Sequence, residues 1–104
     1  MIFVETPIFT AQIKDLLSDD DYGAFQRYLA ENPEAGDVIK ETGGLRKIRV
    51  AAKGHGKSGG ARVIYYYFVS ASRIAMVFAY PKNVQENLTP AQKAALKKVI
   101  EQWR

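Results

Sequence analysis

Basic side chains without neighbouring acids mark the middle of this sequence. No Asp or Glu occurs between Glu41 and Glu86, whereas the first 41 residues have the opposite balance, with nine acids and three bases. A concentration of positive charge on a small domain attracts polyanions, and phosphate backbones are the commonest of these in a cell. We therefore expect a phosphate-binding surface built from the eight basic residues of the acid-free stretch, which are Arg46, Lys47, Arg49, Lys53, Lys57, Arg62, Arg73 and Lys82.

Two of these cations are spaced to lie side by side. Side chains alternate between the two faces of a strand, so an expected strand over residues 45–51 places Lys47 and Arg49 on one face and turns Ile48 and Val50 toward the core. Such a pattern is more often a solvated strand face than a site. Two cations at this spacing with no acid nearby repel each other, however, and a bound phosphate would reverse that cost.

Arg62 opens the next expected strand and has three interpretations. It is an exposed charge at a strand end, the partner of an acid such as Asp37 or Glu41, or a bidentate clamp for a phosphate. His55 is the only histidine. We expect it to be too poorly fixed for acid–base catalysis, because glycines flank it in a Gly-rich, mobile basic loop over residues 53–60.

Composition excludes several classes of protein. The 104 residues include no Cys and one His, which rules against disulfides and a structural zinc, and we expect neither a metal nor a cofactor. No apolar run approaches the roughly 20 residues of a membrane span, and the first residues lack the pattern of a signal peptide. The chain is therefore expected to be a single domain over residues 1–104, soluble, cytoplasmic and not bound to a membrane.

The expected elements place helices around a small sheet. Short-range signals predict a strand over residues 2–4, a helix over 7–17, a second helix after the N-cap Ser18 to about residue 31, and strands over 45–51, 61–69 and 73–80. Thr89 and Gln92 form a capping-box pattern, and Pro90 then takes the first position of a final helix. The order indicates an α+β fold.

Taken as an ordered series, residues 43–50, residues 53–66 and Tyr80-Pro81-Lys82-Asn83 resemble the RelE/ParE toxin superfamily, most closely its HigB-type branch. The similarity covers nearly the whole chain. It implies a small antiparallel sheet with two N-terminal helices and a C-terminal helix. It also implies an mRNA interferase, an endoribonuclease toxin of a type II toxin–antitoxin system that cuts messenger RNA on the ribosome. The implied partners are the ribosome, its mRNA and a helix-turn-helix antitoxin, with operator DNA reached only through that antitoxin.

The resemblance implies catalytic roles for Lys47, Arg49, Arg62 and Lys82. The messenger's own 2′-hydroxyl attacks the neighbouring phosphate, so the protein supplies positioning and charge compensation rather than a nucleophile. We expect Arg62 to compensate charge and Lys47 to act as a base, because neighbouring cations favour the neutral form of a lysine. Lys82 or a tyrosine would stabilise the leaving oxygen. The residues expected to bind RNA are Arg46, Lys53, Lys57 and Tyr80.

Two other functions stay open at this point. The first is a toxin of the ParE type, which poisons DNA gyrase and has no need of phosphate chemistry. The second is a nucleic-acid-binding module without enzymatic activity, for which loss of Arg62 would weaken binding only modestly.

Overall fold

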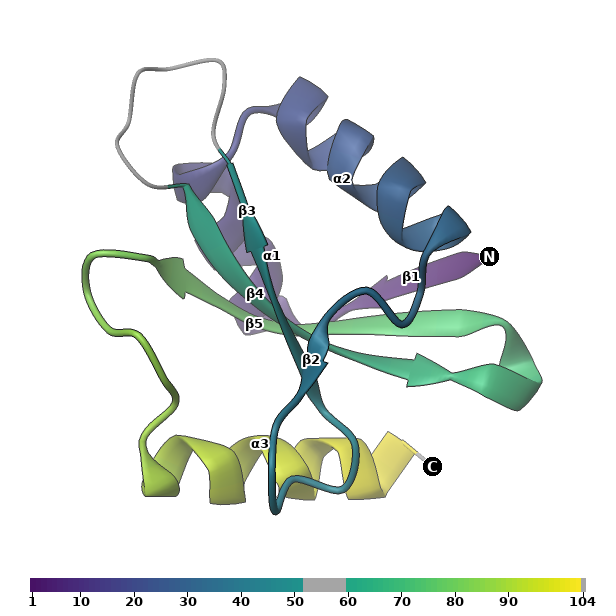
Figure 1. Ribbon diagram of the computed structural model, residues 1–104, viewed down its shortest axis with the longest axis vertical. Helices are drawn as coiled ribbons and strands as arrows, with labels where there is room; N and C mark the ends of the chain where they lie inside the picture. The colour runs from purple at the N-terminus through teal and green to yellow at the C-terminus, as the bar shows by residue number, and fades with distance from the viewer. Residues whose placement is uncertain (52–59, 104) are drawn as a thin grey trace.

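The computed structural model describes residues 1–51 and 60–103. Lys53, His55 and Lys57, on which the predicted basic loop rests, lie outside the described residues. The described chain forms, in order, β1 (Ile2–Glu5), α1 (Pro7–Leu16), α2 (Asp19–Glu31), β2 (Asp37–Val38), β3 (Arg46–Val50), β4 (Ala61–Phe68), a short 3-10 turn (Val69–Ala71), β5 (Arg73–Pro81) and α3 (Pro90–Trp103). The predicted α+β class is confirmed (Figure 1).

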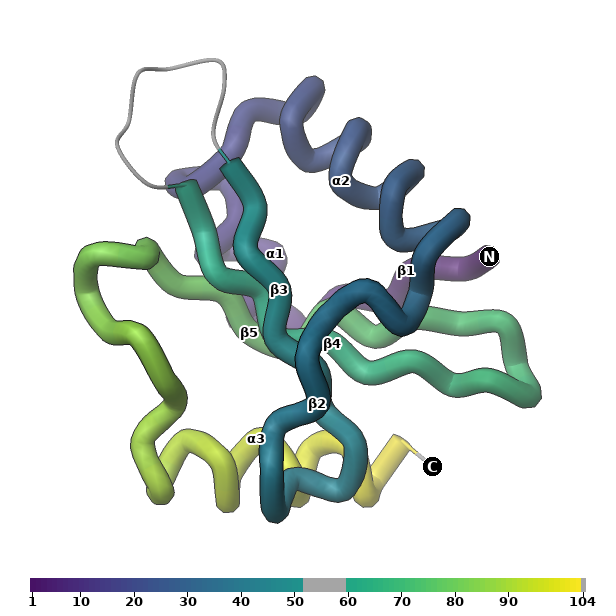
Figure 2. The backbone as a smooth tube through the Cα atoms, in the orientation of Figure 1, coloured from purple at the N-terminus to yellow at the C-terminus, as the bar shows by residue number. Residues whose placement is uncertain are grey.

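The strands form one sheet in the order β1-β5-β4-β3-β2. The pairs β2–β3, β3–β4 and β4–β5 are antiparallel, whereas β1 runs parallel to β5. The resemblance implied a small antiparallel sheet, and β2 to β5 pair in this way, while β1 adds a parallel pair at the edge beyond β5. The tube in Figure 2 shows this order from β1 at the rear edge to β2 at the front.

Side-chain caps fix the starts of the three helices. The caps at Ser18 and Thr89 were predicted, and the cap at Thr6 was not. The Thr6 hydroxyl accepts a hydrogen bond from the Phe9 N–H at 3.1 Å and donates to the Val77 carbonyl at 2.8 Å, so it both starts α1 and ties it to β5. Ser18 accepts from the Asp21 N–H at 3.1 Å at the start of α2. The capping box before α3 is also present, because the Gln92 N–H donates to the Thr89 hydroxyl at 3.1 Å and the Thr89 N–H to the Gln92 side chain at 2.9 Å.

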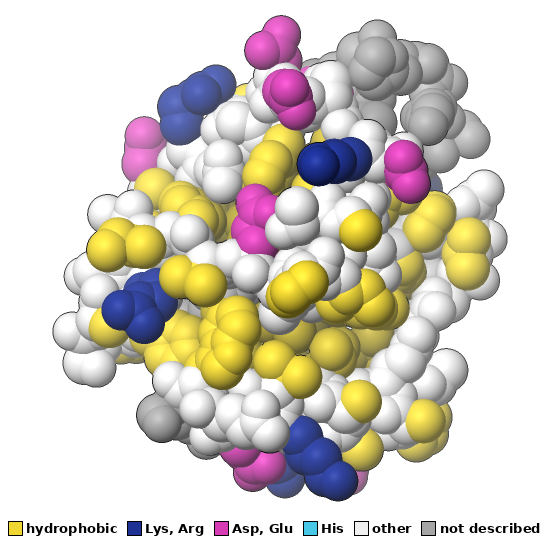
Figure 3. All heavy atoms as spheres, turned by 180° about the vertical axis from the view of Figure 1, so that it is seen from behind, with side chains coloured by type: hydrophobic (Ala, Val, Ile, Leu, Met, Phe, Trp, Pro, Cys, Tyr) yellow, Lys and Arg dark blue, Asp and Glu magenta, His cyan; other side chains and the backbone are white. Residues whose placement is uncertain are grey.

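Apolar cores cover both faces of the sheet. One core joins α1 and α2 to the sheet through residues such as Phe9, Leu29 and Tyr65, all fully buried. The other joins α3 to the opposite face through residues such as Ile64 and Ile100. These two faces are called the α1/α2 face and the α3 face below. From behind, hydrophobic side chains gather across the middle of the molecule, and the Lys and Arg side chains stand apart from one another (Figure 3).

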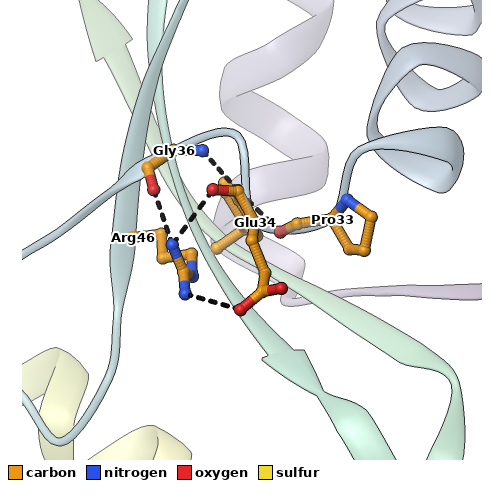
Figure 4. A network of polar contacts seen from close by, with 5 residues as sticks. Pro33, Glu34, Gly36 and Arg46 are labelled. Atoms are coloured by element: carbon orange, nitrogen blue, oxygen red, sulfur yellow. Dashed lines mark hydrogen bonds and ion pairs between the residues drawn. The ribbon is translucent and has the colours of Figure 1, made fainter.

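The two-residue strand β2 was not predicted, and side chains rather than backbone pattern hold the turn before it. The buried Tyr65 hydroxyl accepts from the Gly36 N–H at 2.8 Å and donates to the Pro33 carbonyl at 2.9 Å. Arg46 donates to the carbonyls of Gly36 at 2.8 Å and Glu34 at 3.2 Å, and its guanidinium lies 3.5 Å from the Glu34 carboxylate (Figure 4). This network fixes Asp37, the first residue of β2, beside β3.

Candidate phosphate-binding site

Three cations lie together on the α3 face of the sheet. Arg49 is paired directly with Arg62 across β3 and β4, and Lys47 with the buried Ile64. Cα atoms of directly paired residues in an antiparallel sheet are about 4.5–5.5 Å apart, so the two arginine side chains leave the sheet side by side. Lys47 is two residues away on the same face of β3. We call Lys47, Arg49 and Arg62 the cation cluster.

Burial distinguishes Arg62 from its neighbours. Its side chain is only 7% exposed, whereas Arg49 is exposed. The buried Nε of Arg62 has no hydrogen-bond partner in the part of the chain that the structure describes. The one ion pair of its guanidinium to a described residue joins Nη2 to a Glu86 carboxylate oxygen at 3.5 Å. A buried, permanently charged group with an unsatisfied donor is costly, and an anion with several oxygens would lower that cost.

The segment between β5 and α3 brings two polar groups onto the cluster. Glu86 pairs with Arg62, and the side-chain oxygen of Asn87 accepts from the Lys47 Nζ at 2.7 Å. The Tyr80 hydroxyl donates to the backbone carbonyl of Glu86 at 3.2 Å and holds the segment in place. Burial raises the pKa of Tyr80, an effect that Arg62 opposes and Glu86 reinforces, so the hydroxyl remains protonated near neutral pH.

The acid-free stretch of the sequence is therefore not free of acids in space. Glu86 reaches Arg62, and Asp37 is the direct partner of Lys47 across β2 and β3. We expected cations with no acid nearby, and that expectation was wrong. Asp37 and Glu41 had been considered as partners of Arg62, but Glu86 takes that place.

An open cleft of about 510 Å³ runs beside the cation cluster along the edge of β3. The three cations line one part of it, together with Asp37 and the α2 residue Tyr28. The edge strand β2 pairs only with Arg46 and Lys47, so no further strand of the described chain covers β3 from Ile48 onward and the cleft is open there.

The remaining predicted residues are placed differently. Tyr80 is the direct partner of Arg62 across β4 and β5 and belongs to the same neighbourhood. Lys82 lies one residue beyond β5, is exposed, and does not line the cleft. Arg46 points to the α1/α2 face, where carbonyls and Glu34 already occupy its guanidinium. Sequence reasoning missed Glu86 and Asn87, for which the local signal was that polar residues follow β5. It named Asp37 as a partner of Arg62, whereas Asp37 is paired with Lys47.

A small α+β domain with a buried arginine in a cation cluster at an open sheet edge has the features of a protein that binds polyanions. The family model described as "RelE toxin of RelE / RelB toxin-antitoxin system" matches residues 29–104. The match includes the whole cation cluster and the segment that carries Glu86 and Asn87. The chain belongs to the RelE toxin family and is a toxin of a toxin–antitoxin system, with an antitoxin as its partner. Within the described residues, no helix has the length and apolar character needed to cross a membrane.

Proposed function

We propose that this toxin is a ribosome-dependent endoribonuclease of the HigB type, which cleaves messenger RNA and so inhibits translation in the cytoplasm. The observation that carries the proposal is Arg62. It is almost completely buried, its Nε has no partner among the described residues, and its ion pair within them is to a side chain that is 78% exposed and therefore easily displaced. A phosphodiester, with two non-bridging oxygens that share a negative charge, satisfies such a group better than one distant carboxylate does.

The reaction that fits the cluster is an internal displacement at phosphorus. The 2′-oxygen of the messenger attacks the adjacent phosphorus as its proton leaves, the bond from phosphorus to the 5′-oxygen breaks, and that oxygen takes up a proton. The products are a 2′,3′-cyclic phosphate and a free 5′-hydroxyl. The protein must hold the attacking and leaving oxygens in line and offset the charge that develops on the phosphoryl oxygens.

The residues divide these tasks by position. Arg62 and Arg49 extend side by side and offset charge on the phosphoryl oxygens. Lys47, once released from Asn87, is the candidate base for the 2′-hydroxyl, and Tyr80 or Lys82 is the candidate to protonate or stabilise the leaving oxygen. Arg46, Lys53 and Lys57 would hold more distant phosphates, a contribution to binding that weakens with salt.

The decisive experiment compares Arg62 variants in a translating extract, with mapping of the 5′ ends that appear on the messenger. Arg62→Met keeps most of the buried volume and removes the charge, and Arg62→Ala removes both. We expect each to lower the cleavage rate by about 100- to 1,000-fold, the loss typical of a donor that stabilises a transition state. Arg73→Ala is the matched control, because Arg73 is an exposed arginine at the opposite end of the β4–β5 hairpin, and its cleavage rate should change less than about twofold.

The outcomes separate the candidate functions. Cuts that require ribosomes and disappear in both Arg62 variants, with melting temperature and antitoxin binding retained, support the proposal. Intact messenger together with inhibited DNA supercoiling selects the ParE type of toxin instead. RNA binding that is only slightly weakened in Arg62→Met, without any cleavage by the natural chain, selects a binding module.

A further inference from the structure

The two edges of the sheet differ in how they are protected against a further strand. β2, at one edge, is only two residues long and begins with Asp37. β1, at the other edge, has four residues, three of them apolar, and pairs only with β5. Natural proteins protect sheet edges by short strands, charges or covering elements, because unpaired backbone groups recruit other strands. β1 lacks such protection and has the features of an edge that pairs with a strand of another molecule.

Glu5, the charged residue of β1, does not protect the edge from pairing with another strand. Both carboxylate oxygens of Glu5 are engaged, one accepting from the Thr10 hydroxyl at 2.6 Å and the other from the Tyr22 hydroxyl at 2.5 Å. These bonds turn the side chain toward α1 and α2. Ile2, by contrast, is 60% exposed, and Met1 before it is 45% exposed.

Backbone hydrogen bonds show which groups of β1 face outward. The Ile2 N–H donates to the Ser72 carbonyl at 3.1 Å and the Thr6 N–H to the Met76 carbonyl at 3.0 Å. In a parallel pair, alternate residues bond to the neighbouring strand, so Ile2, Val4 and Thr6 face β5. The N–H and C=O groups of Phe3 and Glu5 therefore point away from the sheet, where the described chain supplies no strand to meet them.

The side chains define what a further strand would carry. Because Phe3 packs in the core under α1, the alternation of the strand puts Ile2 and Val4 on the α3 face. A strand laid beside β1 would meet these two apolar side chains at every second position. Arg73 is the direct partner of Ile2 in β5, is exposed, and forms no ion pair within the described part of the chain, so a carboxylate near that end would be favoured. Figure 3 shows the rear of the molecule, where β1 lies in Figure 1, and hydrophobic side chains gather across its middle.

We propose that the outer edge of β1 is a docking site for the antitoxin, which adds an extended segment as a sixth strand, with apolar side chains over Ile2 and Val4. Backbone bonds to Phe3 and Glu5 would supply affinity, and the alternating apolar residues would set the register. The proposal rests on membership of a toxin–antitoxin family and not on RNA cleavage. β1 and the cleft lie at opposite edges of the sheet, so this contact would leave the cation cluster open.

The first test measures amide hydrogen exchange in the free toxin and in the complex with the antitoxin encoded beside it. We expect exchange at Phe3 and Glu5 to slow by at least about tenfold in the complex, as for amides that gain a strand partner, whereas Ile2, Val4 and Thr6 change little because they are already bonded to β5. Unchanged exchange at Phe3 and Glu5 in the complex would overturn the proposal. Protection of both amides in the free toxin that increases with its concentration would also overturn it, because a second copy of the chain then occupies the edge.

The second test uses a matched pair of substitutions on the two edges. Ile2→Lys places a charge on the proposed docking edge, and Val38→Lys places the same charge on the opposite edge, at a residue with similar exposure of 56%. We expect the antitoxin affinity measured by calorimetry to fall by at least about tenfold for Ile2→Lys and less than about twofold for Val38→Lys. Equal losses, or no loss for Ile2→Lys, contradict the docking site. Messenger cleavage by the free Ile2→Lys toxin is measured separately, so failure of the proposed function remains distinguishable.

Discussion

Replacing Glu86 by Gln is expected to strengthen RNA binding. Glu86 is the acid that pairs with Arg62, and its carboxylate lies 3.5 Å from the guanidinium where a phosphate oxygen would be held. An RNA phosphate must therefore displace this carboxylate. Gln has nearly the same shape but no charge, so Glu86→Gln removes the competitor and keeps the side chain's volume.

The size of the effect follows from the geometry. A contact of 3.5 Å to a carboxylate that is 78% exposed is a weak ion pair. Pairs exposed to this degree contribute about 0.2–1 kcal/mol, because water screens the attraction. Since about 1.4 kcal/mol corresponds to a factor of ten, RNA affinity should rise about 1.5- to 5-fold at low salt. The gain should shrink as salt is added, because both the ion pair and the phosphate contacts are screened.

The assay is fluorescence anisotropy with a labelled RNA whose 2′-hydroxyls are methylated, so that binding is measured without cleavage. Glu101→Gln is the control, because it makes the same change in net charge near the far end of α3, roughly 16 Å along the helix from Pro90 at about 1.5 Å per residue. Equal gains for both variants would show that only net charge matters. Weaker binding by Glu86→Gln would show that the carboxylate helps to hold RNA and does not compete with it.

Three further predictions concern the scaffold. Gly36→Ala should lower the free energy of unfolding by about 1–3 kcal/mol in urea titrations, because a Cβ would lie 2.8 Å from the buried Tyr65 ring and 3.0 Å from the Lys47 carbonyl; an unchanged midpoint would show that the turn relaxes. Thr89→Ala should cost about 0.5–2 kcal/mol by the same measurement, since it removes the N-cap of α3, whereas Thr89→Ser should be nearly neutral. Burial, followed by the hydrogen bond to Glu5, raises the pKa of Tyr22 above its unfolded value of 10.0. The contribution of the protonated hydroxyl to the free energy of unfolding is therefore complete below pH 10 and is lost as the pH rises further. Tyr22→Phe should therefore reduce the loss of stability measured between pH 8 and about pH 11, and an identical loss in both proteins would assign it to other groups.

Local signals were sufficient for most of the fold. The predicted strands over residues 45–51, 61–69 and 73–80 end within one residue of β3, β4 and β5, because alternation and turn residues act over short distances. The caps at Ser18 and Thr89 were predictable for the same reason. The parallel position of β1 and the two-residue β2 were not, because each depends on partners far along the chain, such as Tyr65 for the turn before β2.

The candidate site was predictable only in part. Alternation put Lys47 and Arg49 on one face, but the register that places Arg62 beside Arg49 is a property of the folded sheet. Glu86 and Asn87 lie in a segment without regular structure, 24 and 40 residues from the side chains that they contact. The alternation that predicts strands gives no information on contacts between residues so far apart in the sequence. Arg46 illustrates the converse, since a cation next to Lys47 in the sequence faces the opposite side of the sheet.

The segment between β5 and α3 fixes the competing carboxylate independently of its weak ion pair. Leu88 is buried in the core beneath α3, the Tyr80 hydroxyl bonds to the Glu86 carbonyl, and Gln85 bonds to Gln92 at 2.8 Å in the first turn of the helix. The backbone at Glu86 is therefore held by contacts that do not involve Arg62. RNA need only rotate the exposed Glu86 side chain away and need not move the segment, so the free-energy cost of freeing Arg62 is limited to the ion pair itself. Freeing Lys47 costs in addition its hydrogen bond to the Asn87 side chain. The Arg62 guanidinium is thus paired with Glu86 in the free toxin, and a phosphate can still replace the carboxylate at little cost in free energy.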